Sequence, residues 1–172
     1  MRHDIFPTPL WHIEGAHQQL VDELYQGAYR FKEQYQSTNV SNQGGYQSPI
    51  FNWKEFHPQG IEYMDKVVGD IFKFKVQSWW YNINGKDHWN IPHSHANCDL
   101  ALVWYLTDSD GLLSLMNPFS QRIVDRLGDH ISIDAKKGDI VMFPSDIIHY
   151  VLPNKREEDR ISISMNLQLC GN

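Results

Sequence analysis

Three histidines in the second half of the chain have the type and spacing of metal ligands. His93 and His95 are two residues apart, just before the apolar run 100–106. In an extended chain, residues i and i+2 point to the same face, so both imidazoles can converge on one metal ion. His149, in the segment that begins at Gly138, is the best candidate for a third ligand. Imidazole suits iron, zinc, copper or nickel, and three ligands leave coordination positions open for a reaction.

An arginine follows the third histidine and suggests an anion site. Arg160 lies eleven residues beyond His149 and is followed by Ser162. A metal ion near a buried arginine suits a small dianion, with one carboxylate on the metal and the other on the guanidinium. 2-Oxoglutarate has this form. The alternative for Arg160 is a salt bridge with the acidic run 157–159.

The residues that alternate with Arg160 favour a cavity over a surface role. Ser162, Ser164 and Asn166 share its face of a predicted strand. This row is unusually polar for the core-facing side of a strand. We therefore expect it to line a cavity.

Composition limits the classes of protein that remain. The chain has 172 residues, a formal net charge of −6 and two cysteines, Cys98 and Cys170, far apart in sequence. This length predicts a single domain over residues 1–172 that needs no disulfide or structural metal to fold. The net charge disfavours a nucleic-acid or anionic-membrane partner. No signal-peptide or membrane-spanning run appears, which predicts a cytoplasmic protein.

Hydrophobic periodicity predicts helices first and strands afterwards. Apolar residues recur at three- and four-residue steps over His17–Gln34 and again over Gly60–Ile71. From Phe72 onward the pattern becomes alternation and short apolar runs between turn residues. The predicted strands are Phe72–Asn82, Asp99–Thr107, Leu112–Met116, His130–Asp134, Gly138–Phe143, Ile148–Leu152 and Arg160–Leu169. The fold is therefore mainly β (α+β), a double-sheet jelly roll with N-terminal supporting helices.

The order of these features resembles the 2-oxoglutarate/Fe(II)-dependent oxygenases, and most of all the small oxygenases related to prolyl hydroxylases. The resemblance covers essentially the whole chain. It rests on Phe6–Pro9, Gly45–Ser48, the Trp/Asn strand around Trp80, His93-x-His95, the Gly-Asp-x-x-x-Phe-Pro segment from Gly138, and Arg160-x-Ser162. It implies a double-stranded β-helix, a mononuclear Fe(II), dioxygen as oxidant, and hydroxylation of a substrate coupled to decarboxylation of 2-oxoglutarate to succinate.

The resemblance also assigns roles to individual residues. It places the family's metal-binding histidines at His93 and His149, and its cosubstrate-binding Arg-x-Ser pair at Arg160 and Ser162. The family pattern is His-x-Asp, whereas this chain has His95 in the Asp place. A neutral imidazole there should leave the metal more positive and strengthen its hold on a dianion. We expect His93, His95 and His149 to be the metal ligands and the catalytic centre.

Two alternatives for the third ligand stay open. A register shifted by two residues would make His95-x-Asn97 the family's motif, although it shortens the spacer to the Trp104–Leu106 strand. Asp99 could supply a carboxylate if no bulge intervenes. We prefer the register with His93 and His95.

Further candidates follow from position. Trp80 and Asn82 share a strand face shortly before the metal segment, where related enzymes place 2-oxoglutarate contacts. The loop Ser37–Pro49 and the segment Asn84–Ile91 are candidate covers over the site. The substrate class is a small molecule or a peptide, with a prolyl or other amino-acid residue suggested by the resemblance. The competing functions are a cupin-like three-histidine dioxygenase without 2-oxoglutarate and a non-catalytic jelly-roll binding module.

Overall fold

The computed structural model describes residues 7–15, 17–38, 40–110, 112–118 and 128–171. In chain order the elements are β1 (Trp11–Ile13), α1 (Gln18–Gln34), β2 (Asn42–Gln43), β3 (Tyr46–Gln47), the 3-10 helix η1 (Trp53–Glu55), α2 (Pro58–Val67), β4 (Phe74–Asn84), β5 (Trp89–His93), β6 (Leu100–Tyr105), β7 (Leu113–Met116), β8 (His130–Ile133), β9 (Ile140–Pro144), β10 (His149–Val151) and β11 (Arg160–Leu169). None of the helices among these residues is long and apolar enough to span a membrane.

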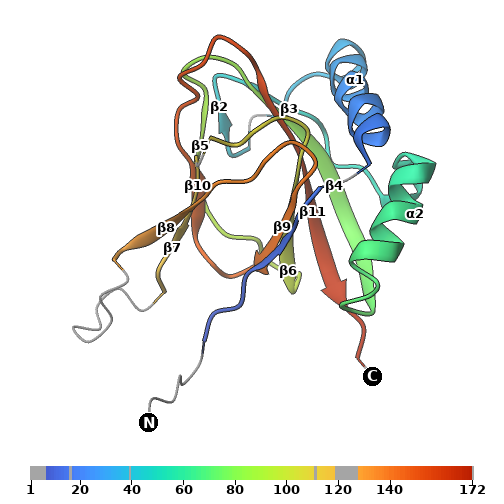
Figure 1. Cartoon of the computed structure of the whole chain (residues 1–172). Helices are drawn as coiled ribbons and strands as arrows, with labels where there is room; N and C mark the ends of the chain where they lie inside the picture. The colour runs from blue at the N-terminus through green and yellow to red at the C-terminus, as the bar shows by residue number, and fades with distance from the viewer. Residues whose placement is uncertain (1–6, 16, 39, 111, 119–127, 172) are drawn as a thin grey trace.

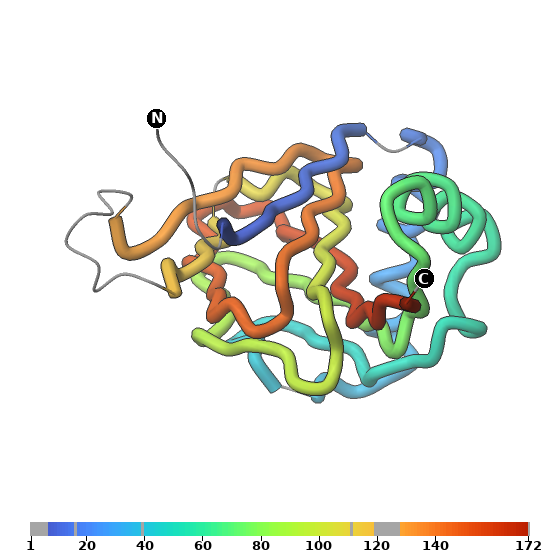
Figure 2. Tube along the Cα trace, turned by 90° about the horizontal axis from the view of Figure 1, so that it is seen from below, coloured from blue at the N-terminus to red at the C-terminus, as the bar shows by residue number. Residues whose placement is uncertain are grey.

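Two antiparallel sheets face each other. The six-stranded sheet has the order β1-β9-β6-β11-β4-β3, and the five-stranded sheet has the order β2-β5-β10-β7-β8. In Figure 1 the helices α1 and α2 lie on one side of the molecule, against the larger sheet, and β5, β10, β7 and β8 lie on the other. Figure 2 shows the same arrangement from below, with the helices grouped at one end of the view. The larger sheet therefore has two covered faces, one toward the helices and one toward the smaller sheet.

Strand β11 shows how the two faces divide the chemistry. Ile161, Ile163, Met165 and Leu167 are fully buried in the core that α1 and α2 share with the larger sheet. The alternate residues, beginning with Arg160, point to the space between the sheets. Antiparallel pairing with both β4 and β6 fixes this register along most of the strand. The apolar face of β11 thus packs against the helices, and its polar face is turned toward the space between the sheets.

The predicted fold class is confirmed, with differences at the level of elements. The helix expected at Gly60–Ile71 instead spans Pro58–Val67. It starts earlier than expected because Pro58 suits the first turn of a helix. Strand β5 was not predicted, since Pro92 and the polar residues of the segment hide its pattern. Pairing with other strands, and not local propensity, also forms the short strands β1, β2 and β3. The Phe6 end of the opening motif lies outside the described residues.

The Gly-Asp pair before β9 fastens the N-terminal segment to the larger sheet. Gly138 has φ +97°, a value that favours glycine. The buried Asp139 carboxylate accepts hydrogen bonds from His12 Nε2 (2.8 Å), Gly15 N (3.0 Å) and Lys136 N (2.9 Å). Burial acts to raise the pKa of Asp139, but these hydrogen bonds outweigh it, and the pKa is lowered. The carboxylate is therefore a fold-stabilising anion.

We predict that Asp139→Ala lowers the free energy of unfolding by about 3 kcal/mol, because two backbone N–H groups lose a charged acceptor. Because the folded-state pKa is depressed, this contribution is present above about pH 4 and is lost as the pH falls through the folded-state value. Urea unfolding at several pH values measures it. Asp134→Ala is the control, since Asp134 forms an exposed pair with Lys136 and should cost about 0.5 kcal/mol or less. Equal losses in the two variants would contradict the role of Asp139.

Candidate metal centre

Three imidazoles converge between the two sheets. One ring nitrogen from each of His93, His95 and His149 lies within 4.8 Å of the others. His93 ends β5 and pairs in register with His149, which begins β10, so the sheet itself brings these two together. Their ring centroids are 4.3 Å apart, and the centroid of His95 lies 5.3 Å from His93 and 5.0 Å from His149. This geometry suits one metal ion held by three nitrogens.

The hydrogen bonds of the three rings select the nitrogen that each presents. The Nδ1 atoms of His93 and His149 lie 2.7 Å and 2.9 Å from the carbonyl oxygens of Ile91 and Ile147. A carbonyl oxygen only accepts, so each Nδ1 carries the proton and donates it. The unprotonated Nε2 is then left with its lone pair. Both rings are thus in the tautomer that a metal requires.

Burial keeps the imidazoles uncharged. Desolvation lowers the pKa of His93 and of His95, and it lowers the pKa of His149 to about 3, with a further lowering from His93. Neutral imidazole is the ligand form of histidine. The three rings therefore form a donor set that is ready to bind a cation near neutral pH.

The two alternative third ligands lie elsewhere. Asn97 is exposed and has φ +64°, a backbone value typical of a turn. Asp99 Oδ2 accepts a hydrogen bond from Leu169 N at 2.7 Å. Among the residues that the structure describes, the group that can hold a metal ion consists of His93, His95 and His149. The geometry thus favours the register with His93 and His95.

A narrow cavity joins the histidines to Arg160. Its lining includes the residues that the sequence assigned to the metal or the cosubstrate, namely Trp80, Asn82, His93, His95, His149, Arg160 and Ser162. Of the other polar residues expected on this face of β11, Ser164 also lines the cavity. Arg160 is only 8% exposed, and burial lowers its pKa to about 10, so it stays cationic at neutral pH. Its Nη1 donates to the carbonyl oxygen of Leu152 at 3.4 Å. Within the described part of the chain, Arg160 forms no ion pair with a carboxylate.

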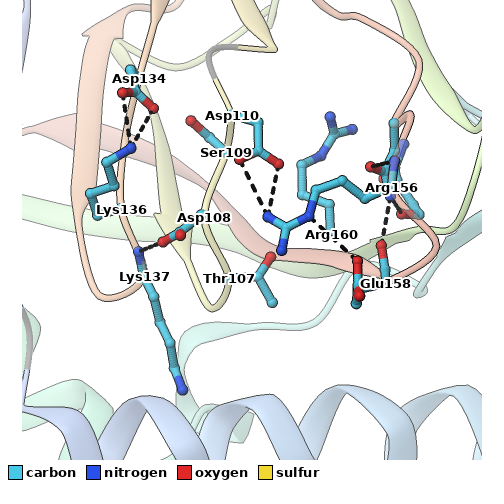
Figure 3. Close-up of polar contacts among 12 residues, drawn as sticks. Thr107, Asp108, Ser109, Asp110, Asp134, Lys136, Lys137, Arg156, Glu158 and Arg160 are labelled. Atoms are coloured by element: carbon cyan, nitrogen blue, oxygen red, sulfur yellow. Dashed lines mark hydrogen bonds and ion pairs between the residues drawn. The ribbon is translucent and has the colours of Figure 1, made fainter.

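The acidic run beside Arg160 is committed to other partners. Glu157 pairs with Lys86, Glu158 pairs with Arg156, and Asp159 accepts from Tyr29. Figure 3 shows the carboxylates of Asp110 and Glu158 joined to Arg156, while Arg160 lies beside them without such a link. The salt-bridge alternative for Arg160 is therefore wrong. A buried cation without a counterion is costly and calls for an anion in the cavity.

A buried chain of amides forms one wall of the cavity. Asn42 Nδ2 donates to Asn84 Oδ1 at 3.0 Å, Asn84 Nδ2 donates to Asn90 Oδ1 at 3.0 Å, and Asn90 Nδ2 donates to Ser41 Oγ at 3.2 Å. Ser41, Asn84 and Asn90 line the cavity. Ser41 and Asn42, in the loop expected as a cover over the site, are thus joined to β4 of the larger sheet and β5 of the smaller one and form part of the cavity wall. Asn84 could have been found from the sequence, since it continues the alternation of Trp80 and Asn82.

Tyr105 is a cavity residue that sequence reasoning missed. It pairs in register with Ser162 and is 3% exposed. Burial raises the pKa of its hydroxyl, and Arg160 acts in the opposite direction. The run 100–106 is apolar throughout, so its pattern does not reveal which side chains face the cavity. Tyr105 therefore adds a neutral hydroxyl beside the guanidinium.

Solved structures with low sequence identity share this fold. A prolyl-4-hydroxylase from Pseudomonas putida has a TM-score of 0.69 at 15% identity, over 94% of this chain and 93% of that one. HygX from Streptomyces hygroscopicus, solved with nickel and 2-oxoglutarate, has a TM-score of 0.68 at 10% identity, over 94% and 83%. A viral collagen prolyl hydroxylase from Paramecium Bursaria Chlorella virus-1, in complex with 2-oxoglutarate, has a TM-score of 0.63 at 14% identity, over 92% and 94%. The predicted double-stranded β-helix is confirmed.

The sequence itself identifies the family. No curated protein matches the chain. The model of the family described as "Putative 2OG-Fe(II) oxygenase" matches residues 78–166, which is just over half of the chain and spans β4 to β11. This range contains the three histidines and Arg160. The chain belongs to the 2OG-Fe(II) oxygenase family.

Proposed function

We propose that this oxygenase binds Fe(II) through His93, His95 and His149, and 2-oxoglutarate through Arg160, to hydroxylate a small molecule or a peptide side chain. The observation that carries the proposal is the convergence of three neutral imidazoles on a cavity with one buried guanidinium, which has no carboxylate partner among the described residues. The bound iron and cosubstrate supply the oxidising chemistry, in which dioxygen is consumed and 2-oxoglutarate becomes succinate and carbon dioxide.

The histidines hold the metal with little rearrangement. In each ring Nδ1 is already hydrogen-bonded and Nε2 is left for the metal. The side chains would therefore lose little conformational freedom when a metal ion binds. Three protein ligands would leave coordination positions of the ion free for cosubstrate and oxidant. Because all three are neutral, the full charge of the ion acts on an incoming carboxylate.

The other end of the cavity supports an anion. Arg160 presents a planar fork that fits a carboxylate, and the hydroxyls of Tyr105 and Ser162 lie on neighbouring strands of the same face. Trp80 and Asn82 complete this pocket. Asn82 Oδ1 is buried without a hydrogen-bond partner among the described residues, which favours a donor such as water or a substrate hydroxyl. A cupin-like centre or a metal-free module gives no reason to place a buried guanidinium at this cavity with no carboxylate partner in the part of the chain that the structure describes.

Cysteine state, net charge and the structural relatives bear on the compartment and the substrate class. We propose that residues 1–172 act as one oxygenase domain in a reducing compartment such as the cytoplasm, since both cysteines are free. A peptide substrate with a prolyl residue is suggested by the prolyl hydroxylases that share the fold. The formal net charge of −6 disfavours a nucleic-acid substrate.

We predict that His149→Ala abolishes Fe(II) binding and turnover, because two imidazoles alone hold the ion poorly. Anaerobic titration of the metal into the apoprotein measures binding, and succinate release measures turnover. His130→Ala is a matched control, since His130 is an exposed histidine on β8 outside the metal group. Undiminished metal affinity in His149→Ala would contradict the triad.

We predict that Arg160→Ala weakens 2-oxoglutarate binding by about 30-fold to several thousandfold, which corresponds to about 2–5 kcal/mol for loss of a buried charged partner. Fe(II) affinity without cosubstrate should change little. Arg160→Lys should restore only part of the affinity, because an ammonium lacks the planar fork.

The control for this prediction is Arg156→Ala. Arg156 is half-exposed, pairs with Asp110 and Glu158, and does not line the cavity of the histidines. Its loss should leave cosubstrate affinity unchanged. Wild-type affinity for 2-oxoglutarate in Arg160→Ala would remove the main support for the cosubstrate assignment.

A further inference from the structure

The three imidazoles are oriented by two different means. His93 and His149 donate from Nδ1 to the carbonyl oxygen two residues before them, so their own backbone sets their tautomer. His95 lies beyond the end of β5 and does not use this local bond. Its Nδ1 lies 2.5 Å from Oδ1 of Asn166, a side chain 71 residues away on β11. The orientation of the His95 ring therefore depends on a side chain from a strand that is distant in sequence.

We propose that Asn166 is the positioning residue for His95: its amide oxygen holds the proton of His95 on Nδ1 and so presents Nε2 to the metal. This inference rests on the metal centre proposed above and explains how a histidine can serve in the place of the family's aspartate. A carboxylate needs no tautomer selection, whereas an imidazole ligates only if its proton lies on the other nitrogen.

The surroundings of Asn166 suit this role. It belongs to the face of β11 that also carries Arg160, Ser162 and Ser164. Its register partners are Ser78 on β4 and Ala101 on β6, both small, so the imidazole has room above the amide. The register with β4 shifts directly after Asn166, and such irregularities often redirect a side chain beside a site.

Neighbouring rings restrict His95 but do not choose its tautomer. The ring of Trp80 lies 5.6 Å from that of His95 between centroids, and His93 stacks on it at 5.3 Å with an interplanar angle of 22°. These contacts limit the rotation of the imidazole. Among the described residues, the hydrogen bond recorded for the His95 ring is the one to Asn166 Oδ1, and an amide oxygen can only accept, so this contact selects Nδ1–H over Nε2–H.

A neutral acceptor also fits the charge of the site. An amide oxygen fixes the tautomer without adding negative charge, so the three ligands stay neutral and the attraction of the metal for a dianion is undiminished. An aspartate at this position would keep the hydrogen bond and raise the basicity of the imidazole. The pair Asn166→Asp and Asn166→Leu therefore separates the hydrogen bond from the shape of the side chain.

The test uses the full chain in metal-free and metal-titrated forms. Long-range ¹H–¹⁵N correlation spectra of the apoprotein report which nitrogen of His95 is protonated. Anaerobic titration with Co(II), followed by its d–d absorption, reports metal affinity. Gln168→Leu is the matched control, because Gln168 is an exposed amide on the same strand that contacts Gln77. The thermal midpoint of each variant verifies folding, and Asn166→Ala provides a smaller substitution if leucine does not fit.

The expected results differ between the variants. In Asn166→Leu and Asn166→Ala, the Nε2–H tautomer of His95 should appear and Co(II) affinity should fall about 10- to 100-fold, the range for losing such an outer hydrogen bond. Asn166→Asp should keep the Nδ1–H tautomer and bind Co(II) at least as tightly as the unaltered chain. Gln168→Leu should change neither property.

Two outcomes would overturn the inference, and they are distinguishable. If the unaltered chain binds Co(II) and Asn166→Leu keeps both the tautomer and the affinity, Asn166 does not position His95. If the unaltered chain binds no Co(II), the metal centre itself is wrong, and the role of Asn166 toward a metal fails with it.

Discussion

The register of β11 between β4 and β6 is the constraint on which the site depends. Because the side-chain period of a strand is two, a shift by one residue would exchange its two faces. The present register sends Ile161 and Ile163 into the core under the helices and sends Arg160 and Ser162 into the cavity. Any slip would expose the apolar row to the cavity and bury a guanidinium among leucines and tryptophans. The hydrophobic core therefore fixes the position of the polar groups, and neither can change alone.

Burial lowers the pKa values of the three histidines and of Arg160, but it removes the charge only of the histidines. Burial holds the three imidazoles neutral, so they add no charge of their own to that of a bound ion. Burial also leaves Arg160 cationic without a carboxylate partner among the described residues. Two positive centres in one cavity are stable together when a dianion bridges them. In the register that we propose, His95 takes the place of the family's aspartate, and a neutral ligand there would add to this attraction for a dianion.

Much of the site could be read from the sequence because its residues follow strand parity. The strand Arg160–Leu169 was predicted with its observed bounds, and its polar row included Asn166. The bond from His95 to Asn166 could not be read, since it joins a loop to a strand across 71 residues. Tyr105 was missed because it stands in a uniformly apolar run. Strand β5 was missed because pairing with β10 and β2, and not its own pattern, makes it a strand.

The most direct test is the visible spectrum of the full chain under anaerobic conditions after addition of Fe(II) and 2-oxoglutarate together. A 2-oxo acid that chelates the iron gives a weak charge-transfer band, and the structure predicts this band only when both are present. Succinate has the same two carboxylates without the 2-oxo group, so it should give no band. A band with saturating 2-oxoglutarate would show that one cavity holds both metal and cosubstrate. Its absence from a chain that has bound Fe(II) would contradict the account.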